Sequence, residues 1–268
     1  MKESFSICLG STSPDPQMPT PRWPAQGPEG FRDAVSAYYR EMEKLARILL
    51  RIIAIGLNLD EHYFDPLENH HWSALRCLNY PHSNKPFQPG QLRISEHTDY
   101  GTITILRADN APGGLQVQKK DGNWADVIFP PGVFTINLGD LMQRWTNDLY
   151  KSTMHRVVPP PVVLNTNGSS AAAEDNRRQS IAFFHNLNRD AMCSTFPSCI
   201  SVDRPSRYEP INAFDHLMSR HAAAVGYSTR LDSKEGIKSN TVEQQPKVGG
   251  ADITGNAWKQ ANTSSSTN

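Results

Sequence analysis

The chain has 268 residues, enough for one large domain or two small ones with a sizeable core. Its 27 basic and 27 acidic residues balance without a long run of one sign, which argues against a surface for nucleic acid or anionic membrane. The four cysteines are scattered without a CxxC pair, and the best apolar stretch, residues 45–57, carries Arg47 and Arg51. These features exclude a predicted bilayer span and indicate reduced thiols in a cytoplasmic protein.

Residues 1–28 are rich in Pro, Ser and Gly and are predicted to form an irregular arm. The next segment has the clearest periodicity, because apolar residues recur at steps of three and four from Phe31 to Ile53. Gly56 and Asn58 end the predicted helix. A long helix with one apolar side is typical of an element that covers a sheet.

From residue 72 to about 184 the pattern changes to short strands separated by turn residues. The predicted strands cover residues 73–79, 101–107, 115–119, 133–137, 152–158 and 179–184. Many short strands with Gly and Pro turns favour a double-sheet core such as a jelly roll, also called a double-stranded β-helix. The predicted fold class is therefore mainly β with flanking helices.

The remaining elements complete the predicted domain. Short helices are expected at residues 140–145 and 212–225, and a flexible surface loop at residues 165–176. Residues 29–233 are predicted to form one domain with its β core at about 72–184. The polar residues 234–268 lack periodicity and are predicted to be a disordered tail.

His97 and Asp99 stand two residues apart in the segment EHTDYGTITIL, at the mouth of a predicted strand. Alternate residues of a strand face the same side, so the two side chains can converge on one point. Two histidines and one carboxylate with open positions are the ligand pattern of non-haem Fe(II) oxygenases. The H-x-D spacing alone, however, occurs by chance in many proteins.

A third ligand has to come from the other histidines. Most of them lie in polar helical stretches or turns, where a solvated or hydrogen-bonded histidine is expected: His62, His70, His71, His82, His216 and His221. His155 follows a turn in the strand-like segment KSTMHRVV, and His185 follows the apolar AFF run. Spacing leaves both of these histidines as candidates.

Arg178 and Ser180 are again two residues apart on a predicted strand and share a face. A guanidinium fork beside a hydroxyl suits the bidentate binding of a carboxylate, a task for which Lys is a poor substitute. Standing alone, such a pair at a strand entrance is more often a surface feature.

Together these stretches resemble the isopenicillin N synthase-like family of 2-oxoglutarate/Fe(II)-dependent dioxygenases. The matching segments, in the family's order, are LRCLNYP (75–81), EHTDYGTITIL (96–106), GGLQV (113–117), NLGDLMQRWTNDLYKSTMHRVV (137–158) and RRQSIAFF (177–184). The resemblance implies that His97, Asp99 and His155 bind iron. It also implies that Arg178 and Ser180 bind the distal carboxylate of 2-oxoglutarate and that Tyr80 positions this co-substrate. The resemblance, not the spacing, selects His155 over His185.

The resemblance further implies an oxygenase that uses Fe(II), 2-oxoglutarate and O2, supported by ascorbate, and releases succinate and CO2. The expected reaction on a small-molecule substrate is hydroxylation, desaturation or ring closure, in specialised metabolism or catabolism. Relatives that halogenate leave the position of Asp99 open to chloride, so this carboxylate argues against halogenation. The sequence does not predict the oligomeric state.

The chain departs from the family pattern in three places. The usual N-terminal region before the long helix is lacking, the loop at 165–176 is longer, and Glu96 stands where a small residue is common. Glu96 is expected to place an extra carboxylate beside the metal. The first departure motivates an alternative, a truncated, weakly active or inactive family member that retains the metal site. An oxidase of the same fold that uses no 2-oxoglutarate is a third hypothesis, against which Arg178 and Ser180 argue only modestly.

Overall fold

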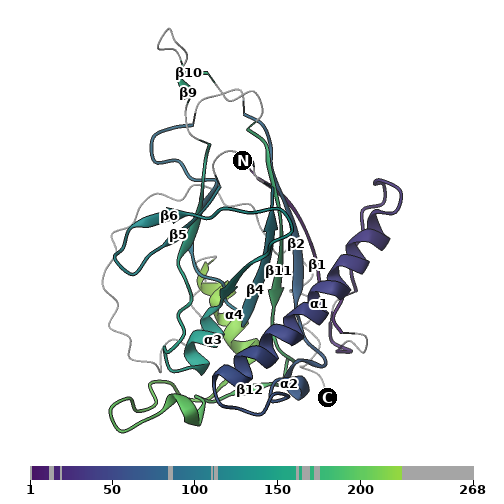
Figure 1. Cartoon of the computed structure of the whole chain (residues 1–268). Helices are drawn as coiled ribbons and strands as arrows, with labels where there is room; N and C mark the ends of the chain where they lie inside the picture. Colours follow the sequence, from purple (N-terminus) through teal and green to yellow (C-terminus); the bar gives the residue numbers. More distant parts are fainter. Residues whose placement is uncertain are drawn as a thin grey trace.

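Two antiparallel sheets make up most of the protein, shown in Figure 1 as a computed structural model. The structure describes residues 2–11, 15–18, 20–83, 87–109, 111, 114–160, 163–164, 170–171 and 176–224. The larger sheet has the strand order β1 (Glu3–Ile7), β2 (Ala74–Tyr80), β11 (Arg178–His185), β4 (Ile103–Ala108), β7 (Thr135–Leu138). The smaller sheet has the order β3 (Ile94–His97), β8 (His155–Val158), β5 (Gly114–Gln118), β6 (Trp124–Asp126).

The two sheets face each other, and side chains from both meet in the space between them. One buried cluster joins Tyr80 and Ala108 of the larger sheet to Leu115 and Val157 of the smaller one. Because side chains alternate along a strand, each of these strands sends every second residue into this interior. The arrangement confirms the predicted jelly-roll core.

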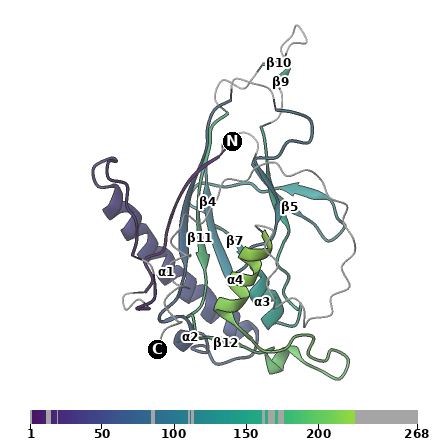
Figure 2. The same ribbon diagram turned by 180° about the vertical axis from the view of Figure 1, so that it is seen from behind.

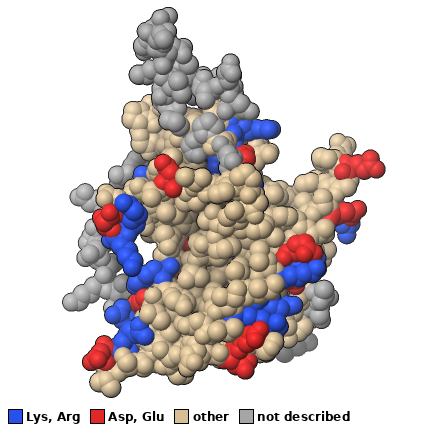
Figure 3. Space-filling view, in the orientation of Figure 1, with Lys and Arg blue, Asp and Glu red and all other residues tan. Residues whose placement is uncertain are grey.

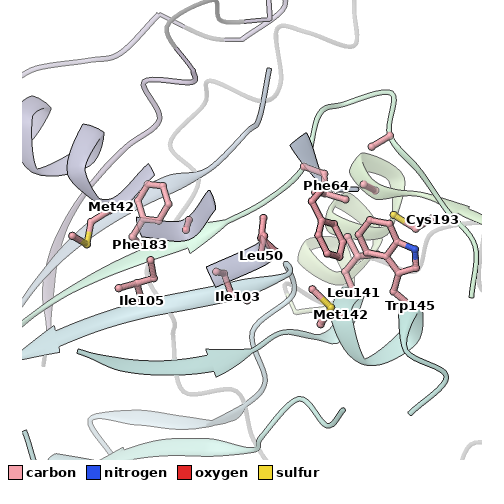
Figure 4. Packing of buried hydrophobic residues seen from close by; sticks show 14 of the residues in the cluster. Met42, Leu50, Phe64, Ile103, Ile105, Leu141, Met142, Trp145, Phe183 and Cys193 are labelled. Carbon is pink, nitrogen blue, oxygen red and sulfur yellow. The ribbon is translucent and has the colours of Figure 1, made fainter. Parts of the chain in front are cut away.

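Helix α1 (Phe31–Gly56) covers the outer face of the larger sheet, which Figures 1 and 2 show from opposite sides. Its buried stripe includes Tyr39, Met42 and Leu50, and the Tyr39 ring contacts that of Phe183. Figure 4 shows Met42, Leu50 and Phe183 within this cluster. The predicted helix is thus confirmed, although Ile52, expected on the apolar face, is 60% exposed. It lies two residues from buried Leu50 and Ala54, a step that turns a side chain away from the stripe.

The shorter elements close the ends of the sheets. They are α2 (Asp65–Glu68), α3 (Asp140–Trp145), α4 (Ala213–Ala224), a 3-10 turn (Pro197–Cys199) and the strand pairs β9 (Val163–Leu164) with β10 (Ser170–Ala171) and β12 (Met192–Cys193) with β13 (Ile211–Asn212). The predicted helices at 140–145 and 212–225 correspond to α3 and α4. Most of the predicted loop at 165–176 and all of the predicted tail at 234–268 lie outside the described residues.

The N-terminal arm is not irregular throughout, which corrects the prediction for residues 1–28. Residues 3–7 form β1, which pairs with β2 at the edge of the larger sheet. Phe5 packs on Phe31, and Ile7 is buried in the core. The segment SFSI alternates polar and apolar residues with the period of a strand, a signal that the surrounding Pro and Ser residues masked.

Charged side chains are mixed on the face drawn in Figure 3. Among its described residues, Lys and Arg lie between Asp and Glu without one large basic area. In the part of the chain that the structure describes, none of the helices combines the length and the apolar character that crossing a membrane demands.

Candidate metal centre

Three side chains that the sequence singled out come together at the ends of the smaller sheet's strands. His97 is the last residue of β3, and His155 is the first residue of β8 and its cross-strand partner. Their ring centroids are 4.3 Å apart, and His155 Nε2 lies 3.7 Å from Asp99 Oδ1. One ligand atom from each of the three residues lies within 4.8 Å of the others.

In each imidazole, the ring nitrogen Nδ1 is held by a hydrogen bond. His97 Nδ1 is 2.8 Å from the carbonyl oxygen of Ser95, and His155 Nδ1 is 2.9 Å from that of Thr153. A carbonyl oxygen only accepts, so each Nδ1 carries the proton and each Nε2 is left with a free lone pair. This is the tautomer that binds a metal ion through Nε2.

Asp99 is held in the same manner, with one oxygen fixed and the other available. Thr104 Oγ1 donates to Asp99 Oδ2 at 2.6 Å, and Asn137 Nδ2 donates to the same oxygen at 2.7 Å. The residue is only 7% exposed, yet Oδ1 points toward His155 rather than to a donor from the protein. Two strands of the larger sheet, β4 and β7, therefore position a ligand that lies in neither.

The sequence suggested that Asp99 shares a strand face with His97. In the structure it does not. It lies in the bend between β3 and β4, whose path is fixed by backbone contacts with the loop before α3. Asp140 N donates to Asp99 O at 2.7 Å, and Gly139 N donates to Thr102 O at 2.8 Å. A Cβ at Gly139 would overlap the backbone of Gly101, so only glycine permits this approach.

The electrostatics of the site favour a neutral His97. Burial lowers the pKa of His97, and the neighbouring His155 ring lowers it further. An uncharged imidazole is the form that binds a metal ion. The donor set of two imidazoles and a carboxylate, with each remaining atom held by a hydrogen bond, fits Fe(II).

Arg178, Ser180 and Tyr80 form a second group in the same interior. Arg178 begins β11 opposite Tyr80 on β2, and all three residues are at most 4% exposed. Burial raises the pKa of the Tyr80 hydroxyl, against the opposite effect of the neighbouring Arg178 charge. The guanidinium carbon lies 5.3 Å from the Tyr80 ring centre and 5.8 Å from that of Phe129.

Arg178 carries a buried charge. Among the described residues, no carboxylate lies within ion-pair distance of it. Burying an unpaired charge is costly, and such a group is normally matched by an anion. Gly114 leaves room for this side chain, since a Cβ there would stand 3.0 Å from Arg178 Nε and the residue has a φ of +133°.

His185, the competitor for the third ligand position, lies on the opposite face of the larger sheet. It is fully buried beneath α1, where Thr102 Oγ1 is 2.7 Å from its Nδ1 and Glu68 lies 3.8 Å from its Nε2. His71 is also fully buried and hydrogen-bonds to Glu43 at 3.0 Å. Both histidines belong to a polar network between α1 and the sheet, away from the three candidate ligands.

Glu96 does not add a carboxylate beside the candidate ligands, which corrects that expectation. Because it precedes His97 on β3, its side chain points to the other face of the sheet. There it accepts a hydrogen bond from Arg156 Nη1 at 3.0 Å, while the Arg156 guanidinium lies 4.0 Å from the Trp124 ring centre.

Sequence reasoning assigned no role to four residues that shape the site: Thr104, Asn137, Gly114 and Phe129. Thr104, Asn137 and Gly114 lie within the stretches EHTDYGTITIL, NLGD and GGLQV that carried the resemblance, so a signal was present for them. Phe129 lies outside these stretches and carries no such signal.

Comparison with known proteins agrees with this geometry. The model of the 2OG-Fe(II) oxygenase superfamily matches residues 69–187. The 2-oxoglutarate-Fe(II) type oxidoreductase hxnY of Emericella nidulans is 34% identical over 227 residues, which are 83% of this chain and 61% of that protein. The proline hydroxylase buaE of Petromyces alliaceus is 34% identical, over 82% of this chain and 67% of its own length.

A solved structure shows the same relationship in three dimensions. A full-length Neurospora crassa protein in complex with alpha-KG (2-oxoglutarate) and thymine superposes with a TM-score of 0.72 at 36% identity, covering 83% of this chain and 65% of that one. The chain thus spans roughly two thirds of the length of these relatives. By sequence and by fold, it belongs to the 2OG-Fe(II) oxygenase superfamily.

Proposed function

We propose that this chain is an Fe(II)- and 2-oxoglutarate-dependent oxygenase that hydroxylates, desaturates or cyclises a small molecule. In this proposal His97, Asp99 and His155 hold the iron. The observation that carries it is the convergence of these three residues, each with its second polar atom already hydrogen-bonded. Bound iron would supply the activation of O2 that is coupled to oxidation of 2-oxoglutarate to succinate and CO2.

The protein side of the co-substrate site is Arg178, Ser180 and Tyr80. The Arg178 fork and the two hydroxyls would bind the distal carboxylate and offset the unpaired buried charge. Gly114, which touches Arg178, pairs with Val158, three residues along β8 from His155. Three residues span about 10 Å along a strand, a distance that a five-carbon dicarboxylate and its contacts at either end can bridge.

The interior between the sheets would exclude water from the reaction. Tyr80, Leu115, Phe129 and Val157 are buried there and form an apolar wall beside Arg178. An apolar wall strengthens the hydrogen bonds to the co-substrate and shields it from solvent. All four cysteines are free in the structure, which supports the reducing cytoplasm as the place of action.

The test measures succinate formed from 2-oxoglutarate with Fe(II), O2 and ascorbate across a panel of small-molecule substrates. Wild type should turn over with at least one substrate, whereas His155→Ala should lose activity and His62→Ala, a change at an exposed histidine, should retain it. Anaerobic titration with Fe(II) and 2-oxoglutarate, followed by the weak charge-transfer absorption of the complex, checks binding separately. Binding without turnover would favour the alternative of an inactive relative, and equal activity of wild type and His155→Ala would refute the iron site.

A further inference from the structure

Arg76 is half-buried and faces the interior between the sheets, and the proposed function gives it no task. On β2, Leu75 packs against α1, whereas Leu78 and Tyr80 belong to the cluster between the sheets. Side chains alternate along a strand, so Arg76 shares the interior face with Leu78 and Tyr80. Its guanidinium carbon lies 5.4 Å from the ring centre of Phe184, an interior residue of β11.

The strand register places this guanidinium near the candidate iron ligands. Phe184 is paired with Thr104 on β4, and Thr104 donates the hydrogen bond to Asp99. Strands β2 and β4 are separated only by β11, which corresponds to about 10 Å between their backbones. The long Arg76 side chain, lying over Phe184, spans part of this distance toward Asp99.

Among the described residues, one side-chain hydrogen bond of Arg76 is seen. Its Nε donates to Ser6 Oγ at 2.9 Å, which leaves the terminal N–H groups of the guanidinium. Within the described residues, no carboxylate forms an ion pair with it, since Asp99 lies farther away and is held by Thr104 and Asn137.

A second positive charge reinforces that of Arg76. Lys2 lies close enough that burial and the charge of Arg76 both lower its pKa. Burial also lowers the pKa of Arg76, against the opposite effects of Cys8 and then Asp99. Two cations in one partly desolvated region attract an anion from solution.

We propose that Arg76 is the substrate-binding residue for a carboxylate, so that the oxidised substrate is a small organic acid. The guanidinium binds the substrate carboxylate through its terminal N–H groups, and the apolar body of the acid lies against Phe184 and Leu78. This orientation puts the body of the acid between Arg76 and the iron ligands. The inference deepens the proposed function and rests on it, because it names the substrate class of the same interior.

The test uses protein that is loaded with Mn(II) in place of Fe(II) and saturated with 2-oxoglutarate. This Mn(II) complex cannot turn over. The probes are benzoate, phenylacetate and hexanoate, each compared with its neutral amide. Paramagnetic Mn(II) accelerates the relaxation of probe protons held near it, so proton NMR reports both affinity and proximity. The variants are Arg76→Gln and Arg76→Lys, with Arg107→Gln as a control because Arg107 bonds to backbone carbonyls on the opposite face of β4.

At least one carboxylate should show Mn(II)-dependent relaxation in wild type, and its amide should not. Arg76→Gln should weaken binding of that acid by about tenfold or more, because a charge-assisted hydrogen bond is lost. Arg76→Lys should keep part of the wild-type affinity for the acid, and Arg107→Gln should keep all of it. Binding of 2-oxoglutarate should stay within about twofold of wild type in the Arg76 variants, because Arg178 carries that charge-assisted contact.

Three results would overturn the inference: equal relaxation of acids and amides, unchanged acid binding in both Arg76 variants, or no relaxation by any of the three acids. Loss of 2-oxoglutarate binding in folded Arg76→Lys would also overturn it, since Arg76 would then serve the co-substrate. Failure of wild type to bind Mn(II) or 2-oxoglutarate would instead refute the proposed function.

Discussion

His97 and His155 face each other across two antiparallel strands, with their ring centroids 4.3 Å apart. Each ring donates from Nδ1 to a carbonyl two residues earlier in its own chain segment. Burial lowers the pKa of His97, and the neighbouring His155 ring lowers it further. His97 is thus favoured in the neutral state that binds a divalent cation, and Asp99 supplies a carboxylate beside it.

Asn137→Ala should weaken metal binding without unfolding the protein. Asn137 holds the Asp99 oxygen that does not face His155, and loss of such an orienting bond typically costs about 10- to 100-fold in affinity. Titration with Co(II), followed by its visible absorption, measures the change. Asn79→Ala, which removes a bond to Glu3 at the sheet edge, is the matched control. Unaltered Co(II) affinity in Asn137→Ala would show that Thr104 alone positions Asp99.

Arg178→Lys should weaken 2-oxoglutarate binding by about tenfold or more while leaving metal affinity near that of wild type, because Lys keeps the charge but loses the planar fork. Gly114→Ala should act in the same direction, since its Cβ would press on Arg178 Nε from 3.0 Å. Calorimetric titration of the Mn(II)-loaded protein with 2-oxoglutarate separates the two affinities. A variant that loses metal and co-substrate equally would point to a general collapse of the interior.

Much of the architecture could be predicted because its signals are local. The helix periodicity identified α1, and turn residues bounded β2, β4, β5 and β11. The arm was predicted as irregular because its strand signal, residues 3–7, is short and the partner β2 lies about seventy residues away. Pairing over such a distance leaves no trace in the local sequence.

The site was predictable in its residue types and less so in its geometry. Spacing left His185 as a candidate ligand, and only the family resemblance selected His155. The structure places His185, seven residues after Arg178 on β11, on the face of the sheet opposite Arg178 and Ser180. The position of Asp99 in a bend could not be predicted, because Thr104, Asn137 and the contact between Gly101 and Gly139 fix it from other parts of the chain.

Gly139→Ala should destabilise the fold and disturb the metal centre together. The added Cβ would overlap the carbonyl oxygen of Gly101, in the bend that also carries Asp99. Backbone overlap of this kind costs roughly 2–4 kcal/mol in the free energy of unfolding. Urea denaturation measures the loss, and Co(II) titration of the folded variant measures the effect on the ligands. Gly122→Ala is the control, because an added Cβ there meets nothing within 4 Å. Its positive φ should lower the free energy of unfolding by less than the overlap at Gly139 does.

His216 on α4 should make the protein less stable as the pH falls. Burial lowers the pKa of His216 to about 4, and its Nε2 has no hydrogen-bond partner among the described residues. Below the ordinary value of about 6.5, the unfolded chain takes up a proton on this residue, whereas the folded protein does so only near pH 4. Stability contributed by the neutral ring is therefore complete above pH 6.5 and declines as the pH falls from 6.5 toward 4.

His216→Asn should remove this pH dependence, because the Asn side chain does not titrate. Each pH unit within that window changes the free energy of unfolding by about 1.4 kcal/mol. Between pH 7.5 and 5, wild type should therefore lose roughly 2 kcal/mol more of this free energy than the variant. Urea unfolding at half-unit steps gives both curves, which should run parallel between pH 7.5 and 8.5. Parallel curves down to pH 5 would mean that the buried ring takes up its proton in the folded state at an ordinary pH, with solvent or Asp140 compensating the charge.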